Sequence, residues 1–175
     1  LISQFDRIYN GIDWGWYPDC FAFTKMHFDL ARRNLYIFAE YRVNKQSNRA
    51  TYDALYHGQT LYSDDFLRKR REEGNPVHQR HLLESDEIVT ADSAEPKSVS
   101  DYRSYGAYGC REAEKGPDSV TYSMKWLQSL NHIYIDPNRC PGTLKEFVEY
   151  EYERDKDDEI VSGYPDENNH SIDSV

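Results

Sequence analysis

The sequence predicts an α/β fold with one mixed β-sheet and helices on both faces of that sheet. Three apolar runs near the start of the chain are joined by short polar links, which is typical of antiparallel strands. Further along, apolar runs alternate with segments of helical periodicity, which indicates later strands that lie parallel in the same sheet. The 175 residues are enough for one domain with a substantial core.

The three antiparallel strands are predicted at residues 8–14, 21–28 and 35–41. In the first strand, Ile8 and Ile12 share one face at strand spacing, and Asp13 points to the other face. The links at residues 15–19 and 29–34 are short, as in a meander.

The rest of the chain alternates between helices and strands. Residues 52–67 have approximate helical spacing, although Gly58 weakens it, and a fourth strand is expected at residues 88–91 beside the first. A helix should begin at Pro96 and end at Gly106. The remaining expected elements are a strand at 110–113, a helix after Asp118, a strand at 132–135, a helix from Pro141 with Leu144, Phe147 and Val148 on one face, and a last helix capped by Asn168 or Asn169.

Composition and charge exclude several classes of protein. A net charge of -10 argues against coating nucleic acid by charge alone. No apolar run approaches the roughly 20 residues that span a bilayer, so no membrane partner is expected. Three widely spaced cysteines make a disulfide framework or a structural zinc site improbable and favour a reducing cytoplasm. The chain starts at Leu1 without a methionine and stops at Val175 in the middle of a pattern, so it is expected to be a fragment, 1–175, of a longer chain. It contains no GxxxxGK[ST] phosphate loop, so any nucleotide-driven motor is expected outside these residues.

Three carboxylates far apart in sequence are the candidate catalytic and metal-ligating residues. Asp13 ends the first strand and Asp92 follows the fourth, so neighbouring strands would place them side by side. Asp173 lies three residues after His170, so both can share one face of the last helix. Clustered carboxylates raise one another's pKa unless cations bind between them, and oxygen ligands favour Mg²⁺ or Mn²⁺. Two such ions can hold a scissile phosphate and activate water.

Each of these residues also has an ordinary structural interpretation. A single Asp at a strand end is often only a turn or a helix cap. Asp13 is less ordinary, because it stands between an apolar strand and two tryptophans, where a carboxylate is partly desolvated. Asp136 is a competing acid that we interpret as a turn residue, and the pair His78 and His81 has ligand-like spacing without an evident acidic partner.

Three motifs carry a resemblance to a known family. The stretches GIDWGW, TADSAEPKS and NNHSIDSV, in this order, resemble the nuclease domain of the large terminase subunit of tailed bacteriophages, in the branch that performs headful packaging. The resemblance covers almost the whole chain, from Tyr9 to Val175. It implies a ribonuclease H-like fold and cleavage of double-stranded DNA that depends on two Mg²⁺ or Mn²⁺ ions. It assigns the catalytic and metal-binding roles to Asp13, Asp92, Asp173 and His170.

The resemblance also implies partners and a location. These are concatemeric viral DNA, an ATPase domain of the same chain before Leu1, the portal protein and the small terminase subunit, in the cytoplasm of the bacterial host. Basic residues that could contact DNA phosphates are Lys97, Arg32, Arg33, Arg68 and Arg70, although such residues often only form a soluble surface.

Two other functions stay open at this point. The first is another ribonuclease H-like enzyme, such as a junction resolvase or a transposase, which needs the same acids. The second is a docking module without catalysis that binds the portal or the motor, for which the 15 tyrosines would suit an interface. Incubation with linear and supercoiled DNA, with and without Mn²⁺, separates these functions.

Overall fold

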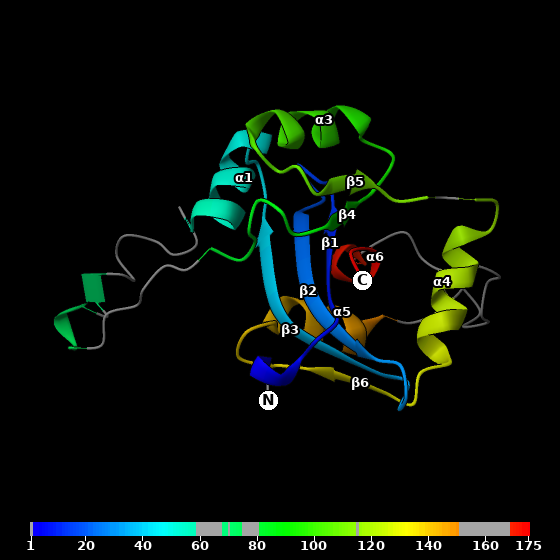
Figure 1. The fold of residues 1–175 in the computed structure, drawn as a ribbon. Coiled ribbons are helices and arrows are strands. Elements are labelled where there is room, and N and C mark those ends of the chain that lie inside the picture. Colours follow the sequence, from blue (N-terminus) through cyan, green and yellow to red (C-terminus); the bar gives the residue numbers. More distant parts are fainter. Residues whose placement is uncertain (1, 59–67, 70, 75–80, 115, 151–168) are drawn as a thin grey trace, which may run out of the picture.

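A six-stranded mixed sheet with the strand order β5-β4-β1-β2-β3-β6 forms the centre of the molecule (Figure 1). The computed structural model describes residues 2–58, 68–69, 71–74, 81–114, 116–150 and 169–175. The strands are β1 (Ile8–Asp13), β2 (Phe21–Asp29), β3 (Asn34–Val43), β4 (Val89–Ala91), β5 (Cys110–Glu112) and β6 (His132–Ile135). The first three are antiparallel, and the later three each pair in parallel with a neighbour. The predicted mixed sheet, with the fourth strand beside the first, is confirmed.

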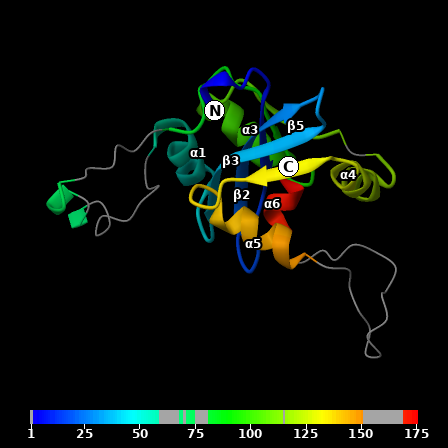
Figure 2. The ribbon, with the colours of Figure 1, turned by 90° about the horizontal axis from the view of Figure 1, so that it is seen from below.

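Helices cover both faces of this sheet, as predicted. The described helical segments are η1 (Ile2–Gln4), α1 (Asn48–His57), α3 (Pro96–Tyr105), α4 (Ser119–Gln128), α5 (Pro141–Glu149) and α6 (His170–Asp173). Figure 1 shows α1 and α3 side by side. Figure 2 shows α5 and α6 together on the other side of the sheet. None of the helices in the described ranges combines the length and the apolar composition needed to cross a membrane.

The face under α1 and α3 is an apolar core. Phe23 from β2 and Leu55 from α1 are completely buried in it, and Val99 and Tyr102 of α3 close it from above. Ser47 caps α1 by accepting a hydrogen bond from the N–H of Ala50 at 3.2 Å. Burial of this many large side chains is the main favourable term in folding this half of the molecule.

Helix α1 differs in extent from the prediction. It begins at Asn48 and ends at His57, because Gly58 adopts a left-handed conformation with φ 69° and its N–H bonds to the Ala54 carbonyl. Glycine takes this conformation without steric cost, which is why it terminates helices so often. Residues 59–67, the rest of the predicted helix, lie outside the described part of the chain.

A bulge in β3 decides which side chains face α5 and α6. Lys25 pairs with Ala39 but the next residue of β2, Met26, pairs with Ile37, so Phe38 is an extra residue in β3. Side chains alternate along a strand, so one extra residue reverses the faces beyond it. Leu35 and Ile37 point toward α5, and past the bulge it is Glu40 and Arg42 that point to this side.

Helix α5 buries only part of the predicted face: Phe147 packs against the apolar cluster around Met26, Leu35 and Ile37, but Val148 does not. Val148 is 71% exposed, whereas Thr143 and Glu146 are buried. The physical reason is that the sheet beneath α5 presents the charged side chains of Glu40 and Arg42, which attract polar partners rather than apolar ones.

Candidate active site

Two of the predicted acids lie at the ends of neighbouring parallel strands. Ile12 in β1 is paired with Ala91 in β4, and both belong to the apolar core. Asp13 and Asp92 follow one position later, so alternation turns them toward the opposite side of the sheet. The Asp92 N–H donates to the Ile12 carbonyl at 3.0 Å, and Trp14 Nε1 donates to the Asp92 carbonyl at 3.1 Å. These bonds hold the two strand ends together.

Helix α6, a single turn that lies across β1 and β2, brings Asp173 to the same side. Gly11 permits this close approach, because a Cβ atom there would overlap the carbonyl oxygen of Ser174. Thr24 of β2 donates its hydroxyl to that carbonyl at 3.1 Å. Asn169 Nδ2 donates to Asp173 Oδ2 at 3.0 Å, and Asn169 also stands at the predicted N-cap position.

All three acids line one cavity of about 620 Å³, which runs along β1 between α6 and α4. Asp13 is the most enclosed of them, at 8% exposure, whereas Asp173 is exposed. The structure therefore brings Asp13, Asp92 and Asp173 from three separate elements to one concave surface, where a substrate and cations could reach all three.

His170 makes a direct polar contact with Asp13. Its Nδ1 lies 3.0 Å from Asp13 Oδ2, and its Nε2 lies 3.5 Å from Asp19 Oδ1. The hydrogen bond to Asp13 raises the pKa of His170, although burial acts in the opposite direction. In this arrangement the imidazole is held between two carboxylates, and Asp13 has a cationic partner when His170 is protonated.

The chemistry of these donors fits a hard divalent cation. Carboxylate oxygens are the preferred ligands of Mg²⁺ and Mn²⁺, and an imidazole nitrogen can complete such a set. As the side chains are placed, no three acids, histidines or cysteines of the described residues surround a single point closely enough to hold an ion. Asp13 is bonded to His170, and Asp173 is bonded to Asn169.

Two of the basic residues predicted to contact DNA, Arg32 and Arg33, lie far along the sheet from the three acids. Asp13 pairs with Ala22 of β2, and β2 ends seven residues later, at Asp29. At roughly 3.3 Å per residue, Ala22 and Asp29 are about 23 Å apart along the strand. The turn with Arg32 and Arg33 begins after Asp29. Arg32 Nη1 bonds to Asp29 at 2.9 Å, and Arg33 Nη2 bonds to Ser129 at 2.6 Å.

The structure describes two of the other residues predicted to contact DNA, Lys97 and Arg68. Lys97 is exposed in the first turn of α3 and is not among the described residues that line the cavity. Arg68 is exposed, and Arg70 lies outside the described residues. Asp136 accepts hydrogen bonds from the N–H groups of Asn138 and Arg139, which confirms it as a turn residue.

Two charged residues on the cavity wall were missed by the sequence reasoning. Arg111 is the central residue of β5, where it pairs with Thr90 of β4 and donates to its hydroxyl at 3.2 Å. Glu114 comes two residues after the end of β5, near the level at which Asp92 follows β4. The sequence did carry a signal for them. Both residues lie in or near the short strand predicted at 110–113, which is the next strand after the one that precedes Asp92.

The strand order and the acids at the ends of β1 and β4 define a ribonuclease H-like domain. In the solved structures, the nuclease domain of the large terminase of bacteriophage SPP1 with bound Mn is similar, with a TM-score of 0.75, 31% identity, and coverage of 99% of this chain and 85% of that one. The P22 large terminase nuclease domain has the same fold, with a TM-score of 0.58, 14% identity, and coverage of 95% and 76%.

Sequence relationships give the family. The model of the terminase RNase H-like domain matches residues 13–175. The large terminase subunit of Bacillus phage SPP1 is 33% identical over 175 residues, 99% of this chain and 36% of that protein. The PBSX phage terminase large subunit of Bacillus subtilis strain 168 is 26% identical over 152 residues, 87% of this chain and 29% of that protein. The chain belongs to the family of RNase H-like nuclease domains of phage large terminase subunits, and it spans about a third of the length of these relatives.

Proposed function

We propose that this chain is a divalent-metal-dependent endonuclease that hydrolyses phosphodiester bonds of double-stranded DNA. The observation that carries the proposal is the convergence of Asp13, Asp92 and Asp173, from β1, the end of β4 and α6, on one cavity. Three carboxylates on a concave surface repel a phosphate by themselves, so a substrate of this charge requires cations between it and the protein.

Asp13, Asp92 and Asp173 would hold Mg²⁺ or Mn²⁺, with His170 as an auxiliary residue. Bound ions of this kind supply charge stabilisation for the phosphorane-like transition state and lower the pKa of water. Asp13 and Asp92 are fixed by strand pairing, so they set the reference position for the substrate phosphate. Asp173 and His170 come from a separate turn and complete the set from above. The SPP1 relative with bound Mn supports this choice of ion.

His170 has a role that does not require direct ligation. Its contact with Asp13 at 3.0 Å orients that carboxylate, and its second nitrogen lies 3.5 Å from Asp19 Oδ1. A side chain in this position can also hold a water molecule or move a proton near the reacting phosphate. We therefore expect His170 to tune the rate and the three aspartates to be essential.

The biological setting follows from the family of large terminase subunits. We infer that the domain cuts concatemeric viral DNA during headful genome packaging in the bacterial cytoplasm. An ATPase domain of the same chain, the portal protein and the small terminase subunit would be its partners. With a net charge of -10, the domain should bind DNA weakly by itself and should rely on the motor domain to hold its substrate.

The test is cleavage of supercoiled and linear duplex DNA by the 175-residue chain with Mn²⁺, with Mg²⁺ and with EDTA. Metal-dependent conversion of both substrates supports the proposal. Cleavage restricted to four-way junctions would indicate a resolvase instead. No cleavage with either metal, by protein that is folded, would leave only a docking role and would contradict the proposal.

A further inference from the structure

Helix α6 is too short to be stable without contacts to other elements. It comprises only His170–Asp173, and an isolated helix of one turn is unstable in water. The placement of Asp173 and His170 over β1 must therefore come from contacts that α6 makes with the rest of the molecule. Gly11 and Thr24 fix its C-terminal end through Ser174.

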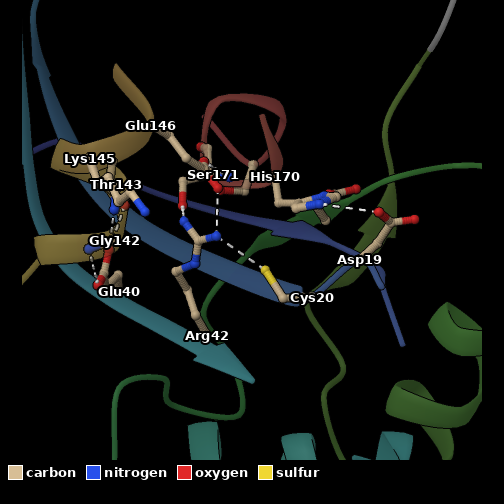
Figure 3. A network of polar contacts seen from close by, with 12 residues as sticks. Asp19, Cys20, Glu40, Arg42, Gly142, Thr143, Lys145, Glu146, His170 and Ser171 are labelled. Carbon is tan, nitrogen blue, oxygen red and sulfur yellow. Dashed lines mark hydrogen bonds and ion pairs between the residues drawn. The ribbon is translucent and has the colours of Figure 1, made fainter. Parts of the chain in front are cut away.

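A charged pair fixes its N-terminal end (Figure 3). Glu146 Oε2 of α5 accepts a hydrogen bond from the Ser171 N–H at 2.6 Å. Arg42 Nη1 of β3 donates to Ser171 Oγ at 2.8 Å. Arg42 Nη2 and Glu146 Oε1 form an ion pair at 2.5 Å, so the two residues that contact Ser171 also contact each other. The same nitrogen of Arg42 lies 3.3 Å from Cys20 Sγ.

This pair is enclosed by the protein. Glu146 is 6% exposed, Ser171 is fully buried, and the Arg42 side chain is 24% exposed. Buried ion pairs are usually no better for stability than well-packed apolar residues of the same size. A gain in stability therefore explains poorly why a charged pair occupies this position. The planar guanidinium of Arg42 contacts three groups in fixed directions, and this explains the pair better.

Three further features set the pair in place. Glu40 accepts hydrogen bonds from the N–H groups of Gly142 at 2.9 Å and Thr143 at 2.7 Å, so it caps the start of α5 (Figure 3). At Gly142, a Cβ atom would lie 2.7 Å from Arg42 Cδ, so glycine lets α5 approach Arg42 closely. The bulge at Phe38 turns both Glu40 and Arg42 toward α5 and α6.

We propose that Arg42 and Glu146 are positioning residues that hold α6 so that Asp173 and His170 meet Asp13 at the metal site. This inference rests on the proposed nuclease function. Ser171 is the point of contact, because it lies directly after His170 and two residues before Asp173. Residues that orient metal ligands from behind typically change metal affinity by roughly 10–100-fold when they are replaced.

The central experiment separates positioning from stability. Arg42→Met alone leaves Glu146 as a buried charge without its partner, and should lower the melting temperature. The double variant Arg42→Met with Glu146→Leu removes both charges and should recover much of that temperature. It still lacks both partners of Ser171, so half-saturation of cleavage should need about tenfold more Mn²⁺ than in the wild type. Recovery of both the melting temperature and the Mn²⁺ requirement would overturn the proposal.

The matched control is Lys25→Met. Lys25 of β2 is also a partly buried cation, bonded to Glu87 at 2.7 Å and to the Leu82 carbonyl at 2.9 Å, but its contacts are with the loop before β4. Its loss should lower the melting temperature without changing the Mn²⁺ requirement. If the Arg42 variants do not fold, Ser171→Ala removes only the hydroxyl contact. It should raise the Mn²⁺ requirement several-fold, and an unchanged requirement would contradict the proposal.

Hydrogen exchange tests the positioning role without catalysis. The Ser174 N–H donates to the His170 carbonyl at 3.1 Å inside the turn of α6, so its protection reports whether this turn is formed. In the double variant this amide should exchange faster, while amides of β1 and β2 keep their protection. If Ser174 stays protected, the proposal is wrong even when wild-type cleavage is robust. If the wild type does not cleave but Ser174 loses protection, only the proposed function fails.

Discussion

The face of the sheet under α1 and α3 is mostly apolar, whereas the face under α5 and α6 combines an apolar cluster around Met26, Leu35 and Ile37 with buried charged and hydroxyl side chains. On the first face Phe23 and Leu55 are completely buried among aromatic and aliphatic neighbours. On the second face the buried groups include Thr24, Glu146 and Ser171, and each has a specific hydrogen-bond partner. Apolar burial is non-directional, while hydrogen bonds fix directions. Apolar burial on both faces therefore stabilises the domain, and the directed hydrogen bonds of the second face also place the candidate catalytic groups.

The largest expected effect is on the acids of the polar face. Asp13→Asn, Asp92→Asn or Asp173→Asn should each slow DNA cleavage by about 10³-fold, since charge stabilisation by bound ions is worth several kcal/mol. The melting temperature should change little, because each change removes repulsion between carboxylates but also weakens a contact of the same side chain, such as that of Asp13 with His170. Calorimetric titration of Mn²⁺ into Asp92→Asn should show the loss of at least one site. Unchanged binding would count against its assignment as a ligand.

On the apolar face, Phe23→Ala should act in the opposite way. Removing a fully buried Phe side chain should lower the free energy of unfolding by about 3–5 kcal/mol, measured by urea denaturation. The Mn²⁺ requirement of the protein that remains folded should not change, because Phe23 touches none of the acids. A strongly raised Mn²⁺ requirement would show that the two faces are not independent.

His170→Ala tests the auxiliary role on the polar face. Loss of the contact with Asp13 at 3.0 Å should slow cleavage by roughly 10–100-fold without abolishing it, as for other groups that orient a metal ligand. Single-turnover rates at saturating Mn²⁺ are the measurement. Cleavage at the wild-type rate would make His170 only a packing residue of α6, and a loss as large as that of Asp13→Asn would make it essential.

Thr24 is the neighbour of Phe23 in β2 but points to the other face, so it gives the sharpest comparison. Thr24→Val keeps the shape of the side chain and removes the hydroxyl that bonds to the Ser174 carbonyl. The loss of stability should be about 1–3 kcal/mol, because the Thr24 hydroxyl contacts both the carbonyl and the hydroxyl of the buried Ser174. Mn²⁺ half-saturation should nevertheless rise, because α6 is held less firmly. A stability loss without any change in Mn²⁺ half-saturation would assign Thr24 to the fold alone.

The difference between the faces also explains what could be predicted from the sequence. The strands followed from apolar runs, which report burial directly, and the mixed sheet with neighbouring first and fourth strands followed from the order of a meander and then alternation with helices. The pairing of Arg42 with Glu146 could not be predicted, because it joins a strand to a helix more than 100 residues later and depends on the bulge at Phe38. A strict alternation from Ile37 would have placed Arg42 in the apolar core. The extra residue is invisible in a pattern of period two.

Motifs, rather than periodicity, pointed to the acids. Asp13 and Asp92 could be proposed as neighbours because each ends a predicted strand, but nothing in the periodicity placed Asp173 over them. Its position depends on Gly11, which acts by the absence of a side chain. The arginines at the hairpin turn were chosen for charge alone, and charge does not tell at which end of a strand a residue lies. The structure puts Arg32 and Arg33 at the end of the sheet that is remote from Asp13.

The smallest expected effect concerns Arg111, the arginine on the cavity wall. Arg111 lies on β5 with its side chain bonded to Thr90, two residues before Asp92, and it lines the same cavity as the three acids. We expect it to contact a DNA phosphate beside the cleaved one. Arg111→Gln should weaken binding of duplex DNA by a few fold and reduce the slope of log K against log salt by about 1, as for one lost phosphate contact.

Arg32→Gln is the matched control, since it removes an arginine at the far end of the sheet and should change neither quantity. If Arg32→Gln has the larger effect, DNA crosses the hairpin turn and not the cavity wall. The polar face would then supply the metal ligands but not the surface that holds the substrate.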